Sequence, residues 1–173
     1  MRYAGLIKDD TAAGPGLCVT FFTQGCPHRC AGCHNPETWD FNGGMEFRPD
    51  LIKEIVDALT DRGIKRNLCI MGGEPLCPEN EFLTMLIILE VRARVQDLKI
   101  YLWSGYTLEE LKHKGSRVRD ILKQVDFLID GRFDQELKDT TLKMRGSSNQ
   151  QIIDMSTVDF SEKILYNIIK EKE

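Results

Sequence analysis

The sequence predicts an α/β fold whose mostly parallel strands form a partial, open barrel. Short apolar segments rich in β-branched and aromatic residues alternate with helical segments, an order typical of parallel strands joined by right-handed crossovers. The predicted strands are fewer than the eight of a complete barrel, which takes about 250 residues. With 173 residues and 42% hydrophobic content, the chain is expected to form one domain over residues 1–173.

The first predicted elements lead into a cysteine-rich loop. Residues 17–23 (LCVTFFT) indicate a buried strand that ends at this loop, and residues 1–7 add an edge strand through a turn at 12–16. Residues 48–63 predict a helix, because Pro49 suits a first helical turn and the apolar side chains form one stripe.

The following segments repeat the order of strand and helix. Residues 67–75 predict a strand that ends at two glycines, and residues 79–95 predict a largely apolar helix. Residues 98–106 predict the next strand, after which Thr107 and Glu110 have the spacing of a capping box. That box opens a helical stretch with a break in its middle.

The C-terminal part adds two short strands, at 126–130 and 150–155, and an amphipathic helix at 161–172. Residues 131–150 show no helical pattern and are expected to form a long functional loop. Because sites in parallel α/β folds lie at the carboxyl ends of the strands, the loops that follow the strands are the expected location of the chemistry.

Charge and hydropathy restrict the class of protein. The net charge of -4 provides no basic field for a nucleic acid or an anionic membrane, so neither is expected as a partner. No apolar run has the length of a membrane span, and the first residues lack the features of a secretory signal. We therefore expect a cytoplasmic protein whose six cysteines are reduced.

Three cysteines lie close together in the segment GCPHRCAGCHN, at Cys26, Cys30 and Cys33. Thiolates are soft ligands that suit zinc or an iron-sulfur cluster. A structural zinc needs a fourth ligand, from a histidine of this loop or from Cys77. A 4Fe-4S cluster held by three cysteines instead leaves one iron open to a chelating small molecule. The spacing favours the cluster, and both alternatives stay open at this point.

A second motif, Gly72, Gly73, Glu74 and Pro75, follows the strand predicted at 67–75. The glycines alone make a tight turn. At the mouth of the sheet, however, they also allow the backbone to approach a ligand closely, with Glu74 as a fixed acceptor beside it.

Two polar residues end the next two strands. Ser104 is either an ordinary turn residue or a cofactor contact, and Asp130 is either a strand-end cap or a polar contact near the cofactor, together with Arg132. His28 and His34 are expected to be solvated or hydrogen-bonded loop residues.

The CxxxCxxC spacing followed by GGEP resembles the radical S-adenosylmethionine superfamily. In that superfamily the amino and carboxylate groups of S-adenosylmethionine bind the open iron, and the GGEP segment hydrogen-bonds the methionine amino group. The resemblance implies a 4Fe-4S cluster on the three cysteines and a partial barrel of the same type. It also implies that Ser104 contacts the methionyl or ribosyl part of S-adenosylmethionine.

Nearly the whole chain resembles the activating proteins of anaerobic ribonucleoside-triphosphate reductase, in the segments AGPGLCVTFFTQGCPHRCAGCHNPETWDFNGG, GGEPL, LWSGYT, LIDGRFD and MRGSSNQ. The resemblance implies reductive cleavage of S-adenosylmethionine at the cluster to a 5′-deoxyadenosyl radical. That radical then installs a glycyl radical on the reductase, which is the protein partner. A flavodoxin-like or ferredoxin-like protein is the implied electron donor.

One position departs from the superfamily. Gly32 stands where an aromatic residue near the adenine is common, so the adenine contacts are unassigned. The polar RGSSNQ segment, residues 145–150, is expected to act at the cofactor or at the partner surface. Cys18 and Cys69 are expected to be small core residues.

Three other functions stay open. A small-molecule radical enzyme, such as a deazapurine synthase, has similar motifs and needs no protein partner. A zinc-binding interaction module uses the cysteines without iron. An electron carrier holds a cluster but has no use for GGEP.

Overall fold

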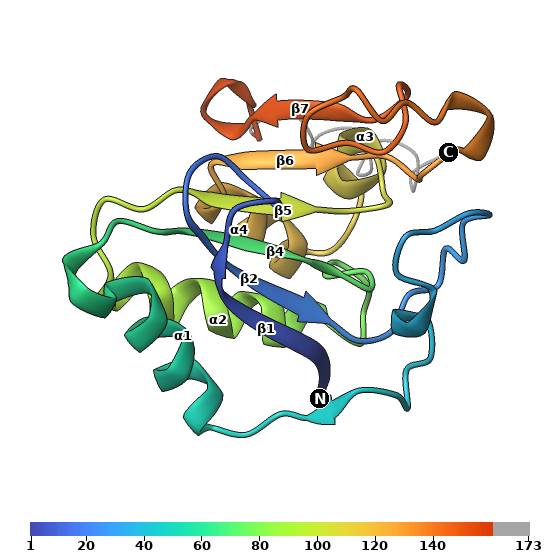
Figure 1. Cartoon of the computed structure of the whole chain (residues 1–173). Coiled ribbons are helices and arrows are strands. Elements are labelled where there is room, and N and C mark those ends of the chain that lie inside the picture. Colours follow the sequence, from blue (N-terminus) through green and yellow to red (C-terminus); the bar gives the residue numbers. More distant parts are fainter. Residues whose placement is uncertain (161–173) are drawn as a thin grey trace, which may run out of the picture.

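A seven-stranded sheet organises the chain, with the strand order β3-β1-β2-β4-β5-β6-β7 (Figure 1). The computed structural model describes residues 1–160. The strands are β1 (Arg2–Asp10), β2 (Cys18–Thr23), β3 (Met45–Glu46), β4 (Asn67–Gly72), β5 (Ile100–Trp103), β6 (Phe127–Asp130) and β7 (Gln151–Asp154). The four central strands, β2, β4, β5 and β6, are parallel, which confirms an α/β fold with a mostly parallel sheet.

The last strand runs in the opposite direction from the one expected. The strand predicted at 150–155 is present as β7, but it pairs antiparallel to β6, with Ile152 opposite Ile129. A parallel pair requires a crossover connection, usually a helix. Between β6 and β7 the chain forms no α-helix, only a short 3-10 turn at Gln135–Leu137 and an isolated β-bridge between Lys138 and Ser147, so it returns from the end of the sheet where β6 stopped. The strand predicted at 150–155 therefore does not extend the parallel part of the sheet, as the alternation of strands and helices had led us to expect.

The predicted helices lie at the connections between the parallel strands. They are α1 (Asp50–Thr60), α2 (Glu81–Arg94), α3 (Leu108–Lys112) and α4 (Ser116–Gln124). The capping box is confirmed, because the Glu110 N–H donates to Thr107 Oγ1 at 3.2 Å and the Thr107 N–H donates to Glu110 Oε2 at 2.7 Å. The helix predicted at 161–172 lies outside the described residues.

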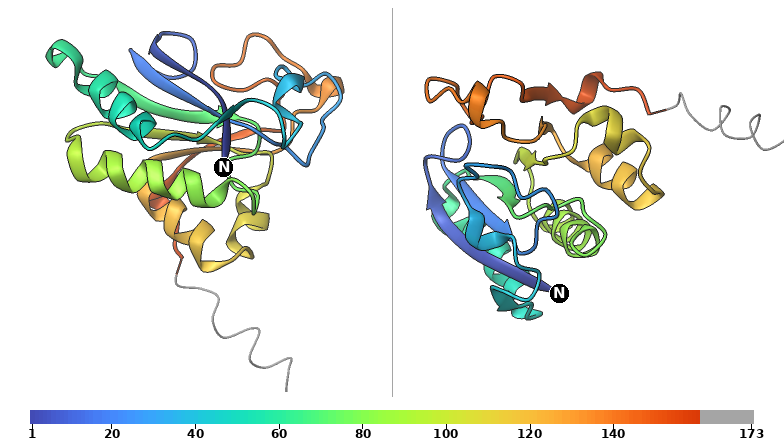
Figure 2. Two further views of the ribbon diagram at one scale, coloured as in Figure 1. Left: turned by 90° about the horizontal axis from the view of Figure 1, so that it is seen from below. Right: turned by 90° about the vertical axis from the view of Figure 1, so that its right-hand side faces the viewer.

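Strand alternation gives the two faces of the sheet different partners. On one face, apolar residues such as Phe21 and Ile70 pack against α1, α2 and α4 in the main core. The apolar cluster on the opposite face is smaller, and in it Cys18, Cys69 and Tyr101 pack against Met144 of the long loop at 131–150. Figure 2 shows α2 and α4 on one side of the sheet and the chain after β6 at its edge.

Cys18 and Cys69 are fully buried, which confirms them as small core residues. Within residues 1–160, no helix combines the length and the apolar character that a bilayer span requires.

Candidate functional site

The loop of residues 24–40, called the cysteine loop below, leaves β2 and is closed on itself by hydrogen bonds. The Cys26 N–H donates to the carbonyl oxygen of Trp39 at 3.2 Å. The buried side chain of Gln24 donates to the carbonyl oxygen of Asp40 at 2.7 Å. These bonds hold the two ends of the loop together at the point where β2 ends.

The two glycines after β4 press the next turn against this base. The Gly73 N–H donates to the carbonyl oxygen of Thr23 and the Glu74 N–H donates to that of Gly25, both at 2.9 Å. A Cβ atom on Gly73 would collide with the Gly25 carbonyl oxygen, and Gly72 has a φ of +101°, which favours glycine. Both glycines are thus required for the backbones to meet.

The Glu74 carboxylate is fully buried and accepts four hydrogen bonds. Oε1 accepts from the Leu76 N–H at 2.9 Å and from Ser104 Oγ at 2.8 Å. Oε2 accepts from the Gly105 N–H at 2.7 Å and from His28 Nε2 at 2.9 Å. This one side chain ties the cysteine loop to the ends of β4 and β5.

A second layer holds His28 from its other side. Arg132 Nε lies 3.1 Å from His28 Nδ1, and Arg132 Nη2 donates to Glu110 Oε1 at 3.0 Å. Because a guanidinium only donates, Nδ1 accepts and the tautomer with hydrogen on Nε2 satisfies both contacts of the ring. The His28 side chain is 6% exposed, so it is one of the hydrogen-bonded loop residues expected and not a solvated one.

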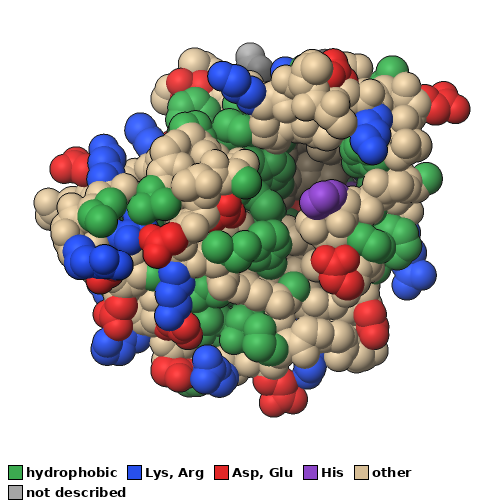
Figure 3. Space-filling view, in the orientation of Figure 1, with side chains coloured by type: hydrophobic (Ala, Val, Ile, Leu, Met, Phe, Trp, Pro, Cys, Tyr) green, Lys and Arg blue, Asp and Glu red, His purple; other side chains and the backbone are tan. Residues whose placement is uncertain are grey.

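A cavity of about 530 Å³ opens at this end of the sheet. Figure 3 shows the hollow, with apolar side chains on its inner walls. The predicted site residues that line it are Cys26, Cys30, Cys33, Gly72, Gly73, Glu74 and Ser104. The sequence motifs therefore converge on one space, although they lie on different elements.

Two residues named from the sequence, Pro75 and Asp130, do not line the cavity. Pro75 is buried, and its carbonyl oxygen accepts from Thr84 Oγ1 at 2.9 Å. Asp130 is 4% exposed, and its Oδ2 accepts from the Leu108 N–H at 2.7 Å. Asp130 thus stands at the end of β6 and fixes the start of α3, as expected of a strand-end cap.

The three thiols of the cysteine loop are partly buried and form no disulfide. Burial raises the pKa of the Cys26 and Cys30 thiols, because a thiolate loses solvation there. Within residues 1–160, no three His, Cys, Asp or Glu side chains are gathered as closely as a single metal ion requires. A cluster differs from a single ion in this respect, because each thiolate binds a different iron atom.

The loop expected to be functional at 131–150 does line the cavity, but most of the individual residues on that wall had no clear signal in the sequence. The far wall of the cavity is formed by residues 131–150, which include Lys138, Met144 and Arg145. Trp39 and Trp103 also line it. The polar RGSSNQ segment was the one hint of Arg145, whereas nothing local distinguished either tryptophan from a core residue.

Comparison with known proteins gives the class of the chain and then its family. The family described as "4Fe-4S single cluster domain" matches residues 12–153, so the chain carries an iron-sulfur cluster domain. Three similar proteins are each named anaerobic ribonucleoside-triphosphate reductase-activating protein, and each aligns with 88% of this chain.

The Escherichia coli (strain K12) relative is 38% identical over 153 residues, which cover 97% of its length. The Pasteurella multocida (strain Pm70) relative is 39% identical, with 96% of its length covered. The relative from Enterobacteria phage T4 is 36% identical over 152 residues, with 93% covered. The chain belongs to the family of anaerobic ribonucleoside-triphosphate reductase-activating proteins, which confirms the resemblance seen in its motifs.

Proposed function

We propose that the protein is a radical S-adenosylmethionine enzyme that installs a glycyl radical on an anaerobic ribonucleoside-triphosphate reductase. The observation that carries the proposal is the meeting of three unpaired thiols and the GGEP turn at one cavity. The names of the relatives, which state activation of this reductase, support the choice of partner.

The donor set fits a 4Fe-4S cluster. Cys26, Cys30 and Cys33 would hold the cluster through three soft thiolates, which would leave one iron for S-adenosylmethionine. Bound there and reduced, the cluster would supply one electron for the cleavage of S-adenosylmethionine to methionine and a 5′-deoxyadenosyl radical, and this radical would take a hydrogen atom from a glycine Cα of the reductase. We propose a flavodoxin-like or ferredoxin-like protein as the source of the electron.

The protein's own residues orient this reaction. Both Glu74 oxygens already accept from protein donors. We therefore assign the methionine amino group to the main chain of Gly72 and Gly73, with Glu74 holding that turn in place. Ser104 lines the cavity, and we assign it to the part of the wall that contacts S-adenosylmethionine. Asp130 supports this wall indirectly, because it accepts from the Leu108 N–H and so fixes the start of α3.

The open sheet suits a protein substrate. We interpret it as a partial barrel, whose missing strands leave a mouth through which a glycine-bearing loop of the reductase reaches the cavity. The walls keep water from the reacting atoms on the other sides. We place the protein in the cytoplasm, where thiols are kept reduced.

The test is anaerobic reconstitution with iron and sulfide, followed by electron paramagnetic resonance of the reduced protein. Addition of S-adenosylmethionine should change the cluster spectrum, and 5′-deoxyadenosine should form. Cys30→Ala should lose both, with its helical circular dichroism unchanged. The proposal would be contradicted if the wild-type cluster assembled, its spectrum did not change on addition of S-adenosylmethionine, and no 5′-deoxyadenosine formed.

A further inference from the structure

His28 is the residue at which four segments around the cavity meet. It lies in the cysteine loop, and its Nε2 donates to the Glu74 carboxylate of the GGEP turn at 2.9 Å. Its ring packs edge-on against Tyr106, with centroids 4.4 Å apart, and a Cβ atom on Gly105 would lie 2.4 Å from its Cδ2. On the far side, Nε of Arg132, in the loop at 131–150, lies 3.1 Å from Nδ1. The ring is therefore clamped between the chain after β5, the GGEP turn and the loop at 131–150.

The main chain of His28 contacts one of the three thiols. Burial raises the pKa of the Cys26 thiol, and hydrogen bonds from the N–H groups of His28 and Arg29 partly offset this rise. Arg29 has a φ of +49°, an unusual conformation for a residue other than glycine. Such a conformation persists only where the surrounding structure holds it. Because His28 contacts Cys26 through its main chain and the GGEP turn through its side chain, it fixes the position of one relative to the other.

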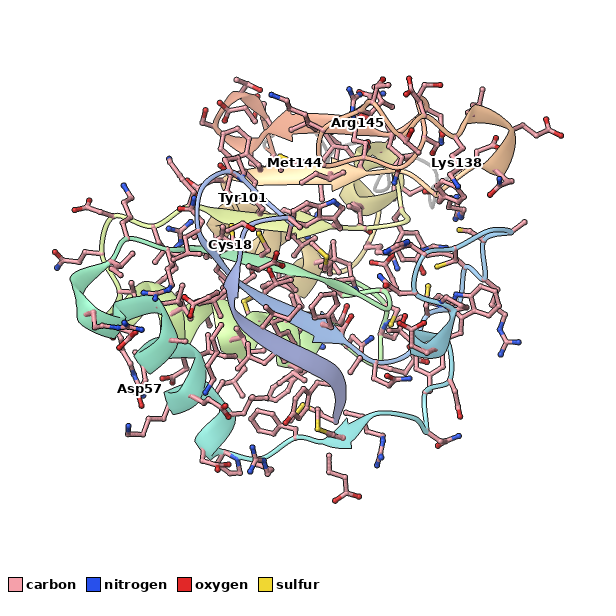
Figure 4. The ribbon with its side chains drawn as sticks, viewed as in Figure 1. Cys18, Asp57, Tyr101, Lys138, Met144 and Arg145 are labelled. Atoms are coloured by element: carbon pink, nitrogen blue, oxygen red, sulfur yellow. The ribbon has the colours of Figure 1, made fainter. Side chains whose placement is uncertain are left out.

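Neither ring nitrogen of His28 is free to bind a ligand. Nε2 donates to Glu74, and Nδ1 accepts from Arg132, whose Nη2 donates to Glu110 at 3.0 Å. His28 lines the cavity, whereas Arg132 does not. Figure 4 shows Lys138, of the same loop as Arg132, on the side of the cysteine loop. His28 therefore acts on a bound molecule through the placement of the cysteine loop and not through a hydrogen bond of its own.

We propose that His28 is a positioning residue, which holds the cysteine loop against the GGEP turn and thereby sets how tightly S-adenosylmethionine binds between them. This inference rests on the proposed function, since it takes S-adenosylmethionine as the occupant. The role requires a donor toward Glu74 and an acceptor toward Arg132. Glutamine supplies both, through its Nε2 and its Oε1, whereas leucine has a similar size and supplies neither.

The test measures the binding of S-adenosylmethionine to the reconstituted protein by anaerobic calorimetry. His28→Leu should weaken binding by about tenfold or more, because it leaves the buried Glu74 carboxylate without one of its donors. His28→Gln should stay within about threefold of the wild type. At one concentration of S-adenosylmethionine, the electron paramagnetic resonance spectrum of the cluster should change in His28→Gln and not in His28→Leu. His113→Leu is the matched control, because His113 is exposed and does not line the cavity.

A second variant acts on His28 from outside the cavity. The Arg132 side chain is 47% exposed in its ion pair with Glu110, so Arg132→Leu should leave the fold intact. It should weaken binding of S-adenosylmethionine by about fivefold, because the ring loses its support at Nδ1. Arg117→Leu is the control, since Arg117 is 48% exposed in a similar pair with Glu81 and does not line the cavity either. We expect it to change binding by less than about twofold.

Two results would overturn the assignment of His28. If His28 only fills space, His28→Leu and His28→Gln bind S-adenosylmethionine equally well. If Arg132 does not act through His28, Arg132→Leu binds as Arg117→Leu does, and this comparison alone decides should His28→Leu assemble no cluster. A wild-type protein whose assembled cluster does not bind S-adenosylmethionine would instead refute the proposed function, whereas equal binding by the wild type and all variants would refute only the role of His28.

Discussion

Substitution of Glu74 by glutamine tests whether this side chain holds the site together. The carboxylate accepts from two main-chain N–H groups, those of Leu76 and Gly105, and from the side chains of Ser104 and His28. A glutamine places its NH₂ group toward one pair of these donors. A hydroxyl can turn and an imidazole can change tautomer, but a main-chain N–H cannot.

Either orientation of the amide therefore leaves one buried main-chain donor facing another donor, which costs about 1–3 kcal/mol. Loss of the charge-assisted character of the remaining bonds adds to this, so we expect Glu74→Gln to lower the free energy of unfolding by about 3 kcal/mol. Urea denaturation of the anaerobic apo-protein measures this directly.

The control is Glu46→Gln, because the Glu46 side chain is 84% exposed in its ion pair with Arg2. We expect the control to change the free energy of unfolding by less than about 0.5 kcal/mol. If Glu74→Gln were no more destabilising than Glu46→Gln, the view of Glu74 as the link between the cysteine loop and the sheet would be refuted.

Three further predictions follow from the geometry. Gly73→Ala should lower the free energy of unfolding by more than about 2 kcal/mol, because the added Cβ meets the Gly25 carbonyl oxygen. Gly5→Ala is the control: its added Cβ meets nothing within 4 Å, so it should change the free energy of unfolding by less than about 1 kcal/mol. Similar midpoints of urea denaturation for the two variants would contradict the close contact of Gly73 with Gly25. Burial raises the pKa of Cys77 to about 12. Iodoacetamide at about pH 8 should therefore label Cys77 far more slowly than the three thiols of the cysteine loop, as measured by peptide mass spectrometry. Equal labelling rates would contradict the burial of Cys77. Burial alone would raise the pKa of Asp126, but the hydrogen bonds and positive charges around it lower the pKa from 3.8. The wild-type protein should therefore exceed Asp126→Asn in its free energy of unfolding by the full amount above about pH 5, and this difference should shrink as the pH falls below about 4. A difference that does not change with pH would count against the lowered pKa of Asp126.

Features with strong local signals were predictable from the sequence. The capping box at Thr107 depends on two residues three positions apart, and the parallel strands depend on short β-branched runs between helices. The direction of β7 was not predictable, because it depends on residues 131–150, which have no periodic pattern. The strand β3 has two residues and leaves no pattern to read.

The site was predictable only in its motifs. The spacing of the cysteines and the glycine pair indicated thiolates and a close backbone approach, and the structure brings both to one cavity. The contact of His28 with Glu74 joins residues 46 positions apart, and so depends on the pairing of β2 with β4 and not on any local pattern. The RGSSNQ segment hinted at Arg145 from the sequence, whereas Trp39 became a candidate only when the structure placed it on the cavity wall.

The proposed function requires the formation of a glycyl radical on an anaerobic ribonucleoside-triphosphate reductase. The most direct measurement is the electron paramagnetic resonance spectrum of an anaerobic mixture of reconstituted protein, reductant, S-adenosylmethionine and that reductase. We expect a glycyl doublet on the reductase that disappears when its target glycine is replaced by alanine. Formation of 5′-deoxyadenosine without the doublet on the reductase would contradict the proposed function.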